Sequence, residues 1–229
     1  GMHTRSYAVG ERDGWVFVFR GEVASAPEIP YFEQIEGRFV HHTTCQDWPT
    51  NYARMIENQM DLQHIQTVHR TTIAHVTPAS MRVHVSVEGR QIRNRFFDGD
   101  QAWDNYLHLI YPNIWHNRIG EDFRVMAAFV PLDAGHTRVY LRTMHRFVPR
   151  WLGGGLVARL AHVMNTKVLA QDRSVVLAQR PMDTLEATGE KLLDTDPGVI
   201  AYRKMHRAHW HAREAAAQSS DSALRVARA

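Results

Sequence analysis

The chain has 229 residues and a mass of 26.4 kDa, which suits one large domain or one domain with a small appendage. Hydrophobic residues make up 44% and charged residues 22%, the composition of a globular protein rather than a disordered one. The formal net charge of only +3 gives no argument for nucleic-acid binding, and the single cysteine, Cys45, excludes a disulfide, zinc ribbon or iron–sulfur cluster built within this chain.

Targeting signals are absent from the sequence and histidine is abundant. Gly1 ahead of Met2 is typical of a residue left by tag cleavage, so Met2 is expected to be the natural start. No apolar run approaches the roughly 18 residues of a membrane-spanning helix, and no signal peptide is visible. We therefore expect a cytoplasmic protein. The 15 histidines favour a metal site, because histidine is the commonest metal ligand, without locating one.

The first part of the chain predicts a hairpin followed by a linker. Apolar residues alternate over residues 5–20 around a turn at Asp13-Gly14, which indicates two short antiparallel strands. Such a hairpin is too short to fold alone and must pack on another element. Pro27 and Pro30 prevent regular pairing, so this stretch is expected to be a linker.

A run of strands and three helices is expected after the linker. A strand over residues 38–46 leads to a helix that begins at Asn51 with Thr50 as its cap. Alternating segments separated by turn residues then predict six further strands, at residues 81–87, 91–97, 103–111, 114–119, 123–131 and 137–147. A long helix over residues 156–180 and a second over residues 197–216 follow. This order indicates an α+β fold, with a curved antiparallel sheet wrapped on the long helix near the C-terminus.

The stretch from Asn58 to His69 contains the residues most indicative of chemistry. His64 and His69 are five residues apart, which is about 140° around a regular helix, so they converge only if the helix breaks or widens between them. Asp61 lies three residues before His64, shares its face and can hydrogen-bond with it. Two histidines with this spacing are commonly surface or core residues, but the added asparagine and aspartate favour a functional site.

This segment, Asn58-x2-Asp61-x2-His64-x4-His69, resembles the mononuclear iron motif in the catalytic α-subunit domain of Rieske non-haem iron oxygenases. Residues 169–177 resemble the C-terminal helix of that family, in which an aspartate completes the iron site; here Asp172 follows His69 by 103 residues. Residues 13–21 resemble the last strand of the Rieske domain, and residues 26–30 resemble the interdomain linker. The vanillate O-demethylase and pheophorbide a oxygenase-like branch is the most similar.

The resemblance implies specific roles for five residues. His64, His69 and Asp172 are expected to bind one Fe(II) as a facial triad of two histidines and a carboxylate. Asp61 is expected to hydrogen-bond an iron-ligating histidine and to bridge towards the Rieske cluster of a neighbouring subunit. Asn58 is expected to lie near the iron without being a firm ligand.

The resemblance also implies a helix-grip fold of the START or Bet v1 type and three segments. Residues 2–30 would be the remnant of a Rieske-domain hairpin and its linker, residues 31–216 the mononuclear iron catalytic domain, and residues 217–229 a flexible tail. The implied activity is that of an oxygenase that activates dioxygen at Fe(II) to hydroxylate a ring or remove an O-methyl group. The substrate would be apolar and aromatic.

The chain departs from the family pattern in the ligands of the Rieske cluster. A Rieske centre needs two cysteines and two histidines, and this chain has one cysteine. Either the gene model starts late, the cluster lies on a separate polypeptide, or electron delivery has been lost; if the chain is active, a [2Fe–2S] cluster is expected in trans. The implied partners are therefore a Rieske or ferredoxin-type electron donor with its reductase, without which the chain is expected to be inactive. Family members assemble as rings of three, which implies a homotrimer. No nucleic-acid or membrane partner is expected.

Two other interpretations remain open at this point. The first is a non-catalytic START-like protein that binds a hydrophobic ligand and keeps a relic metal site, because a fold alone does not specify a function. The second, weaker one is a zinc-dependent hydrolase with the same ligands, for which the sequence offers no further general base. The metal content of the triad distinguishes the first from an oxygenase. Neither the substrate nor the choice between monooxygenase and dioxygenase chemistry follows from these residues.

Overall fold

The computed structural model describes residues 4–19, 21–74, 81–187 and 189–226, with the backbone alone from residue 216 onward. Arg20, within the expected hairpin and the Rieske-like strand, and residues 2–3 and 227–229 of the expected end segments lie outside this description. The strands are β1 (Ala8–Arg12), β2 (Trp15–Phe19), β3 (Val40–Trp48), β4 (Arg82–Glu88), β5 (Gln91–Asp98), β6 (Gln101–Ile110), β7 (Ile114–Arg118), β8 (Phe123–Pro131) and β9 (Thr137–His145). The α-helices are α1 (Tyr52–Met60), α2 (His64–Val68), α3 (Gly154–Val176) and α4 (Pro197–Val226).

Strands β1 and β2 form the expected hairpin. Asp13 and Gly14 connect them with positive φ angles of 52° and 75°, which matches the right-handed twist of a two-residue hairpin. The hairpin is held to the large sheet by its turn, where the Arg142 guanidinium donates to the Asp13 carbonyl over 2.7 Å and the Tyr31 hydroxyl donates to the Asp13 carboxylate over 2.9 Å. Packing on the main body thus supplies the stability that an isolated hairpin lacks.

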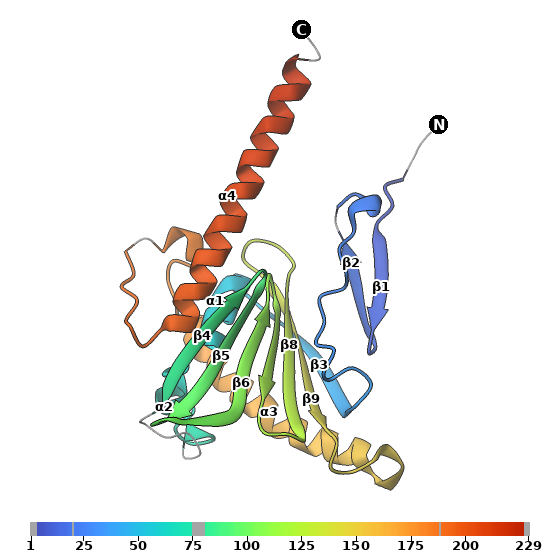
Figure 1. Cartoon of the computed structure of the whole chain (residues 1–229), viewed down its shortest axis with the longest axis vertical. Coiled ribbons are helices and arrows are strands. Elements are labelled where there is room, and N and C mark those ends of the chain that lie inside the picture. The colour runs from blue at the N-terminus through green and yellow to red at the C-terminus, as the bar shows by residue number, and fades with distance from the viewer. Residues whose placement is uncertain (1–3, 20, 75–80, 188, 227–229) are drawn as a thin grey trace.

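The other seven strands form one open antiparallel sheet in the order β3-β9-β8-β7-β6-β5-β4. From β4 to β9 each strand pairs with the next one in the chain, and β3 pairs with β9 to form one edge of the sheet (Figure 1). Successive side chains face opposite sides, so on β7 Trp115 belongs to one hydrophobic cluster and Ile114 to another. The sequence prediction of seven strands in this region is therefore confirmed.

The larger cluster lies between the sheet and the helices, and it includes Trp115, Leu169 on α3 and Tyr202 on α4. Helix α3 lies across the sheet and contacts β3 and β9 (Figure 1). The smaller cluster covers the opposite face of the sheet with Phe32 and Ile35 from the segment that follows the hairpin. The predicted α+β class and the curved sheet around a long helix are confirmed.

Three helix ends differ from those expected. Asn51, rather than Thr50, caps α1, and its side chain accepts a hydrogen bond from the Ala53 amide over 2.9 Å. Helix α3 ends at Val176, four residues before the predicted Arg180. Helix α4 continues to Val226, so residues 217–226 are helical where the sequence predicted the end of the helix. The division of the chain into three segments stays a prediction. Among the described helices, none has the length and apolar composition needed to cross a membrane.

Candidate metal centre

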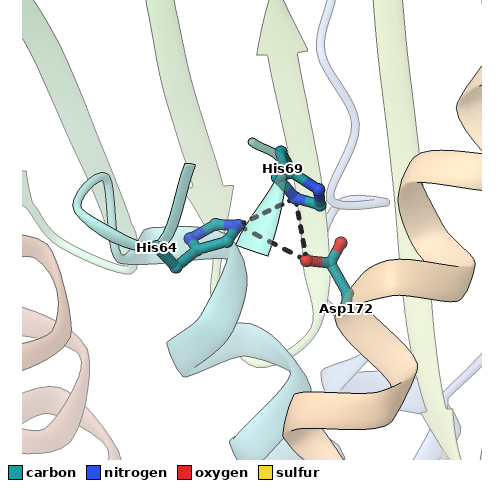
Figure 2. A group of neighbouring side chains, drawn as sticks. All are labelled: His64, His69 and Asp172. Atoms are coloured by element: carbon teal, nitrogen blue, oxygen red, sulfur yellow. Dashed lines mark hydrogen bonds and ion pairs between the residues drawn. The ribbon is translucent and has the colours of Figure 1, made fainter. Parts of the chain in front are cut away.

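Three side chains from two distant parts of the chain meet beside α2 and α3. Figure 2 shows the imidazoles of His64 and His69 and the carboxylate of Asp172 pointing toward one another. The two Nε2 atoms lie 3.2 Å apart, and the Asp172 Oδ1 atom lies 3.4 Å from His64 Nε2 and 3.0 Å from His69 Nε2. His69 is 2% exposed and Asp172 3%, so these two members lie inside the protein, while His64 is partly exposed.

The local chain path explains how two histidines five residues apart converge. Helix α1 ends at Met60, because Asp61 adopts extended angles of φ −81° and ψ 118° as its C-cap. A separate short helix, α2, then starts at His64 and ends at Val68. His69 follows as the C-cap with φ −99° and ψ 23°, outside helical geometry, so its ring turns back toward His64. The residues that interrupt the helices thus allow the convergence that a regular helix would forbid.

Both imidazoles are oriented through their Nδ1 atoms. The His64 Nδ1 atom is hydrogen-bonded to the main-chain carbonyl of Asp61. The His69 Nδ1 atom lies 2.9 Å from the side-chain carbonyl oxygen of Gln171. Because a carbonyl oxygen only accepts, both Nδ1 atoms must carry the proton, and in the neutral rings both Nε2 atoms present a lone pair to the cluster.

Asp172 contributes a third lone pair. Its Oδ2 atom accepts a hydrogen bond from the Gln59 side chain over 3.2 Å, whereas its buried Oδ1 atom has no hydrogen-bond partner among the described residues. Burial raises the pKa of Asp172, but the adjacent imidazoles lower it by more, so the net shift is strongly downward. Burial lowers the pKa of His69, but Asp172 raises it by more. Both directions show that this cluster favours positive charge between its members.

The cluster fits a metal cation. Three lone pairs that face one another in a buried space repel unless a proton or a metal ion lies between them. Donor atoms bonded to one ion at about 2.1 Å lie roughly 3.0–3.4 Å apart, which agrees with the three separations in this cluster. Two neutral imidazoles and one carboxylate form the ligand set of the facial triad that binds non-haem Fe(II).

Of the two other motif residues, Asp61 contacts the cluster directly and Asn58 lies on α1. The expected hydrogen bond between Asp61 and His64 exists, but it uses the carbonyl of Asp61, while the carboxylate accepts the Gln63 amide over 2.7 Å. Burial raises the pKa of this carboxyl group above its usual range. Asn58 is 5% exposed on α1, and its Nδ2 atom has no hydrogen-bond partner within the described residues. The roles expected for these two residues stay predictions.

Sequence reasoning missed two glutamines. Gln59 follows Asn58 and donates to Asp172, and Gln171 precedes Asp172 and accepts from His69. Their only signal in the sequence is that they are neighbours of residues in the motif, since neither contact follows from spacing along the chain. Partners of this kind fix the orientation of metal ligands.

Comparison with known proteins identifies a common domain. The family model of the vanillate O-demethylase oxygenase C-terminal domain matches residues 48–212. Chlorophyllide a oxygenase, chloroplastic, of Chlamydomonas reinhardtii is 25% identical over 185 residues, which cover 74% of this chain and 28% of that protein. The vanillate O-demethylase oxygenase subunit of Pseudomonas sp. (strain ATCC 19151) is 34% identical over 104 residues, 42% of this chain and 30% of that protein. The chain thus spans less than a third of either relative.

Solved structures share the fold. Dicamba monooxygenase bound to dicamba superposes with a TM-score of 0.72 at 18% identity, over 92% of this chain and 71% of that one. NdmB of Pseudomonas putida CBB5 gives a TM-score of 0.71 at 19% identity, over 87% of this chain and 59% of that one. NdmA of the same organism, in a QL mutant solved with theobromine, gives 0.68 at 20% identity, over 88% of this chain and 60% of that one.

Proposed function

Because the chain belongs to the family of vanillate O-demethylase oxygenase C-terminal domains, the catalytic domains of Rieske-type oxygenases, we propose that it oxidises a small apolar, aromatic substrate at a mononuclear iron centre. The observation that carries this proposal is the convergence of His64 Nε2, His69 Nε2 and Asp172 Oδ1 in a buried cluster. These three atoms would hold ferrous iron. Bound there, iron supplies the activation of dioxygen.

The protein residues of this site act by orientation and by exclusion of water. The carbonyls of Asp61 and Gln171 keep the imidazole protons on Nδ1, so that Nε2 stays free in both rings. Gln59 restrains the Asp172 carboxylate through Oδ2 and leaves Oδ1 directed at the histidines. With Asp172 and His69 almost fully buried, bulk water is kept from this side of the cluster.

The substrate and partners are proposed from the relatives. Dicamba and theobromine are the small molecules named with two of the solved structures, which supports a ring-containing substrate for hydroxylation or demethylation. With one cysteine, residues 1–229 lack the ligands of a Rieske cluster, and we propose that electrons reach the site from a Rieske or ferredoxin-type centre outside these residues. Asp61, at the C-cap of α1, is proposed to link the site to that donor.

Iron content tests the proposal directly. The full chain is loaded anaerobically with ferrous iron, desalted and assayed by elemental analysis, together with His64→Ala, Asp172→Ala and the control His84→Ala. His84 is an exposed histidine on β4 and is not a member of the cluster. We expect one iron per chain in the wild type and in His84→Ala. We expect loss of stoichiometric iron in the other two variants, because the two remaining ligand atoms do not hold the metal as three do.

Undiminished iron in His64→Ala or Asp172→Ala contradicts the site. A wild-type chain that takes up no iron but binds apolar aromatic compounds supports instead a ligand-binding protein with a relic site. For an iron-loaded chain, product formation from aromatic methyl ethers with an added Rieske-type donor and reductase tests the activity.

A further inference from the structure

We infer that Gln171 is a positioning residue that selects the imidazole tautomer of His69 and thereby keeps its Nε2 atom available to a metal ion. The inference rests on the proposed function, since it concerns how the same cluster is prepared for a cation. The role belongs to the Gln171 side chain, which supplies none of the three donor atoms of the cluster.

The Gln171 amide is fixed by three contacts with one short segment. Its Oε1 atom lies 2.9 Å from His69 Nδ1 and accepts the Thr72 hydroxyl over 2.8 Å. Its Nε2 atom donates to the Thr71 hydroxyl over 3.1 Å. The amide is therefore held at both ends by residues 69–72, and α3 is connected to the turn that follows α2.

The direction of this amide decides which nitrogen of His69 keeps its proton. In the observed direction a carbonyl oxygen faces Nδ1, so Nδ1 donates and Nε2 is bare. The reversed amide would present an N–H to Nδ1, and the ring would then carry its proton on Nε2, 3.0 Å from Asp172 Oδ1. That proton would occupy the space of the cation. Because threonine hydroxyls both donate and accept, Thr71 and Thr72 tolerate either direction, and His69 is the partner sensitive to it.

The position of Gln171 in the chain couples this effect to the carboxylate. Gln171 directly precedes Asp172 on α3, so one turn of helix supplies both the carboxylate and the acceptor that orients His69. Gln59 on α1 completes the arrangement by donating to Asp172. The two segments that form the cluster thus orient each other's side chains.

Two substitutions separate this role from ordinary packing. Gln171→Glu keeps an acceptor toward Nδ1, whereas Gln171→Met has similar length and no acceptor. Ser174→Ala on the same helix is the control, because it removes one exposed hydroxyl, which donates to the Gln171 main-chain carbonyl. Zinc serves as a diamagnetic probe of affinity, measured by chelator competition. Long-range ¹H–¹⁵N correlation spectra of the metal-free chain at alkaline pH report the His69 tautomer.

We expect Gln171→Met to weaken zinc binding about 10- to 100-fold and to shift His69 toward the Nε2–H tautomer. Gln171→Glu and Ser174→Ala are expected to keep the Nδ1–H tautomer and to bind zinc within a few-fold of the wild type. Equal weakening in Glu and Met variants, or an unchanged tautomer in Gln171→Met, overturns the inference. If the wild type binds no zinc, the proposed function fails, while the tautomer spectra still decide the role of Gln171.

Discussion

Two of the buried polar atoms without partners lie on the segments that form the candidate site. Within the described residues, Asp172 Oδ1 and Asn58 Nδ2 are buried and make no hydrogen bond. An unsatisfied buried donor or acceptor costs about 1–3 kcal/mol, so a folded chain keeps one where a ligand satisfies it or where function requires it. For Asp172 the proposed metal ion would supply that partner, and for Asn58 a molecule bound beside the metal would do so.

Replacing Asn58 with leucine tests this explanation. Asn58→Leu is expected to raise the free energy of unfolding of the metal-free chain by about 1 kcal/mol, because it removes a buried unpaired donor at similar volume. Asn94→Leu is the control: Asn94 is fully buried and its Oδ1 atom is also unpaired, but its Nδ2 atom donates to the Met60 carbonyl over 3.1 Å, so the substitution removes the donor to that carbonyl and is expected to destabilise. Urea unfolding of both variants provides the measurement. Destabilisation by Asn58→Leu equal to that of Asn94→Leu contradicts the explanation.

The sequence specified the three converging side chains better than the atoms that orient them. His64, His69 and Asp172 were expected because they match the ligand positions of the family that the sequence resembles. The carbonyl of Asp61 and the amide of Gln171 do not, because every residue has a carbonyl and glutamine is common on helix surfaces. Which of them meets an imidazole depends on the break after Met60 and on where α3 crosses α2.

At the scale of elements, the alternation of apolar residues predicted the strands closely. The ends of the helices were predicted less well. Both Thr50 and Asn51 are good caps. The structure uses Asn51 because Thr50 is engaged elsewhere: its amide donates to the Trp48 carbonyl, and its own carbonyl accepts the Thr137 hydroxyl over 2.8 Å. Pro181 prompted a late end for α3, yet the chain leaves the helix after Val176. Tertiary contacts of this kind are not contained in a local pattern.

A buried charge network connects α1 and α4. Glu57 accepts from Arg54 over 2.9 Å and from Arg203 over 2.6 Å, and both arginines also bind Glu190. Glu57 is 4% exposed, Arg54 1% and Arg203 6%. The Thr184 hydroxyl donates to the same carboxylate. The network precedes Asn58 directly in the chain, so it fixes the helix whose end leads to the candidate site.

Removal of the central carboxylate is expected to be costly. Glu57→Ala leaves the buried guanidinium groups of Arg54 and Arg203 without the Glu57 carboxylate. The substitution should lower the free energy of unfolding by about 3–5 kcal/mol. The control is Asp47→Ala, which breaks the exposed pair with Arg138 and should cost under about 1 kcal/mol. Urea unfolding at neutral pH compares them. Similar small losses in both variants contradict the role assigned to the network.

At the scale of the whole molecule, two buried histidines are expected to set the acid limit of stability. Burial, with nearby arginine charge, lowers the pKa of His116 to about 3 and that of His108 to about 4. Below about pH 6.5 the unfolded chain gains protons that the folded chain refuses, so stability falls as pH falls. At pH 5 the loss is about 2 kcal/mol for each histidine.

His116→Leu tests this acid sensitivity. Neither ring nitrogen of His116 has a hydrogen-bond partner in the described part of the chain, so leucine leaves no group unpaired. The decrease in unfolding free energy between pH 7.5 and pH 5.0 should be smaller by about 2 kcal/mol in this variant. The exposed His84→Leu variant should behave like the wild type. An unchanged pH dependence in His116→Leu contradicts the assignment.

An apolar face on the outside of α3 bears on the predicted homotrimer. Trp151, just before the helix, is 84% exposed, and Leu156, Leu160 and Met164, spaced four residues apart on α3, are 64%, 63% and 52% exposed. Residues 147–171 contain no aspartate or glutamate, so the charged residues of this segment are arginine and lysine. An apolar face of this kind commonly marks a protein interface.

We expect this face to drive association of the chain, up to a trimer, and Leu160→Glu to shift the mass toward the monomer. Because basic residues on facing copies repel, raising the salt concentration should strengthen the association by screening them. Val16→Glu on β2 is the control, since Val16 is equally exposed, at 70%, but lies on the hairpin. Light scattering across a range of concentrations measures the mass. A wild-type chain that stays monomeric at every concentration and salt, or an unshifted mass in Leu160→Glu, rejects this face as the interface.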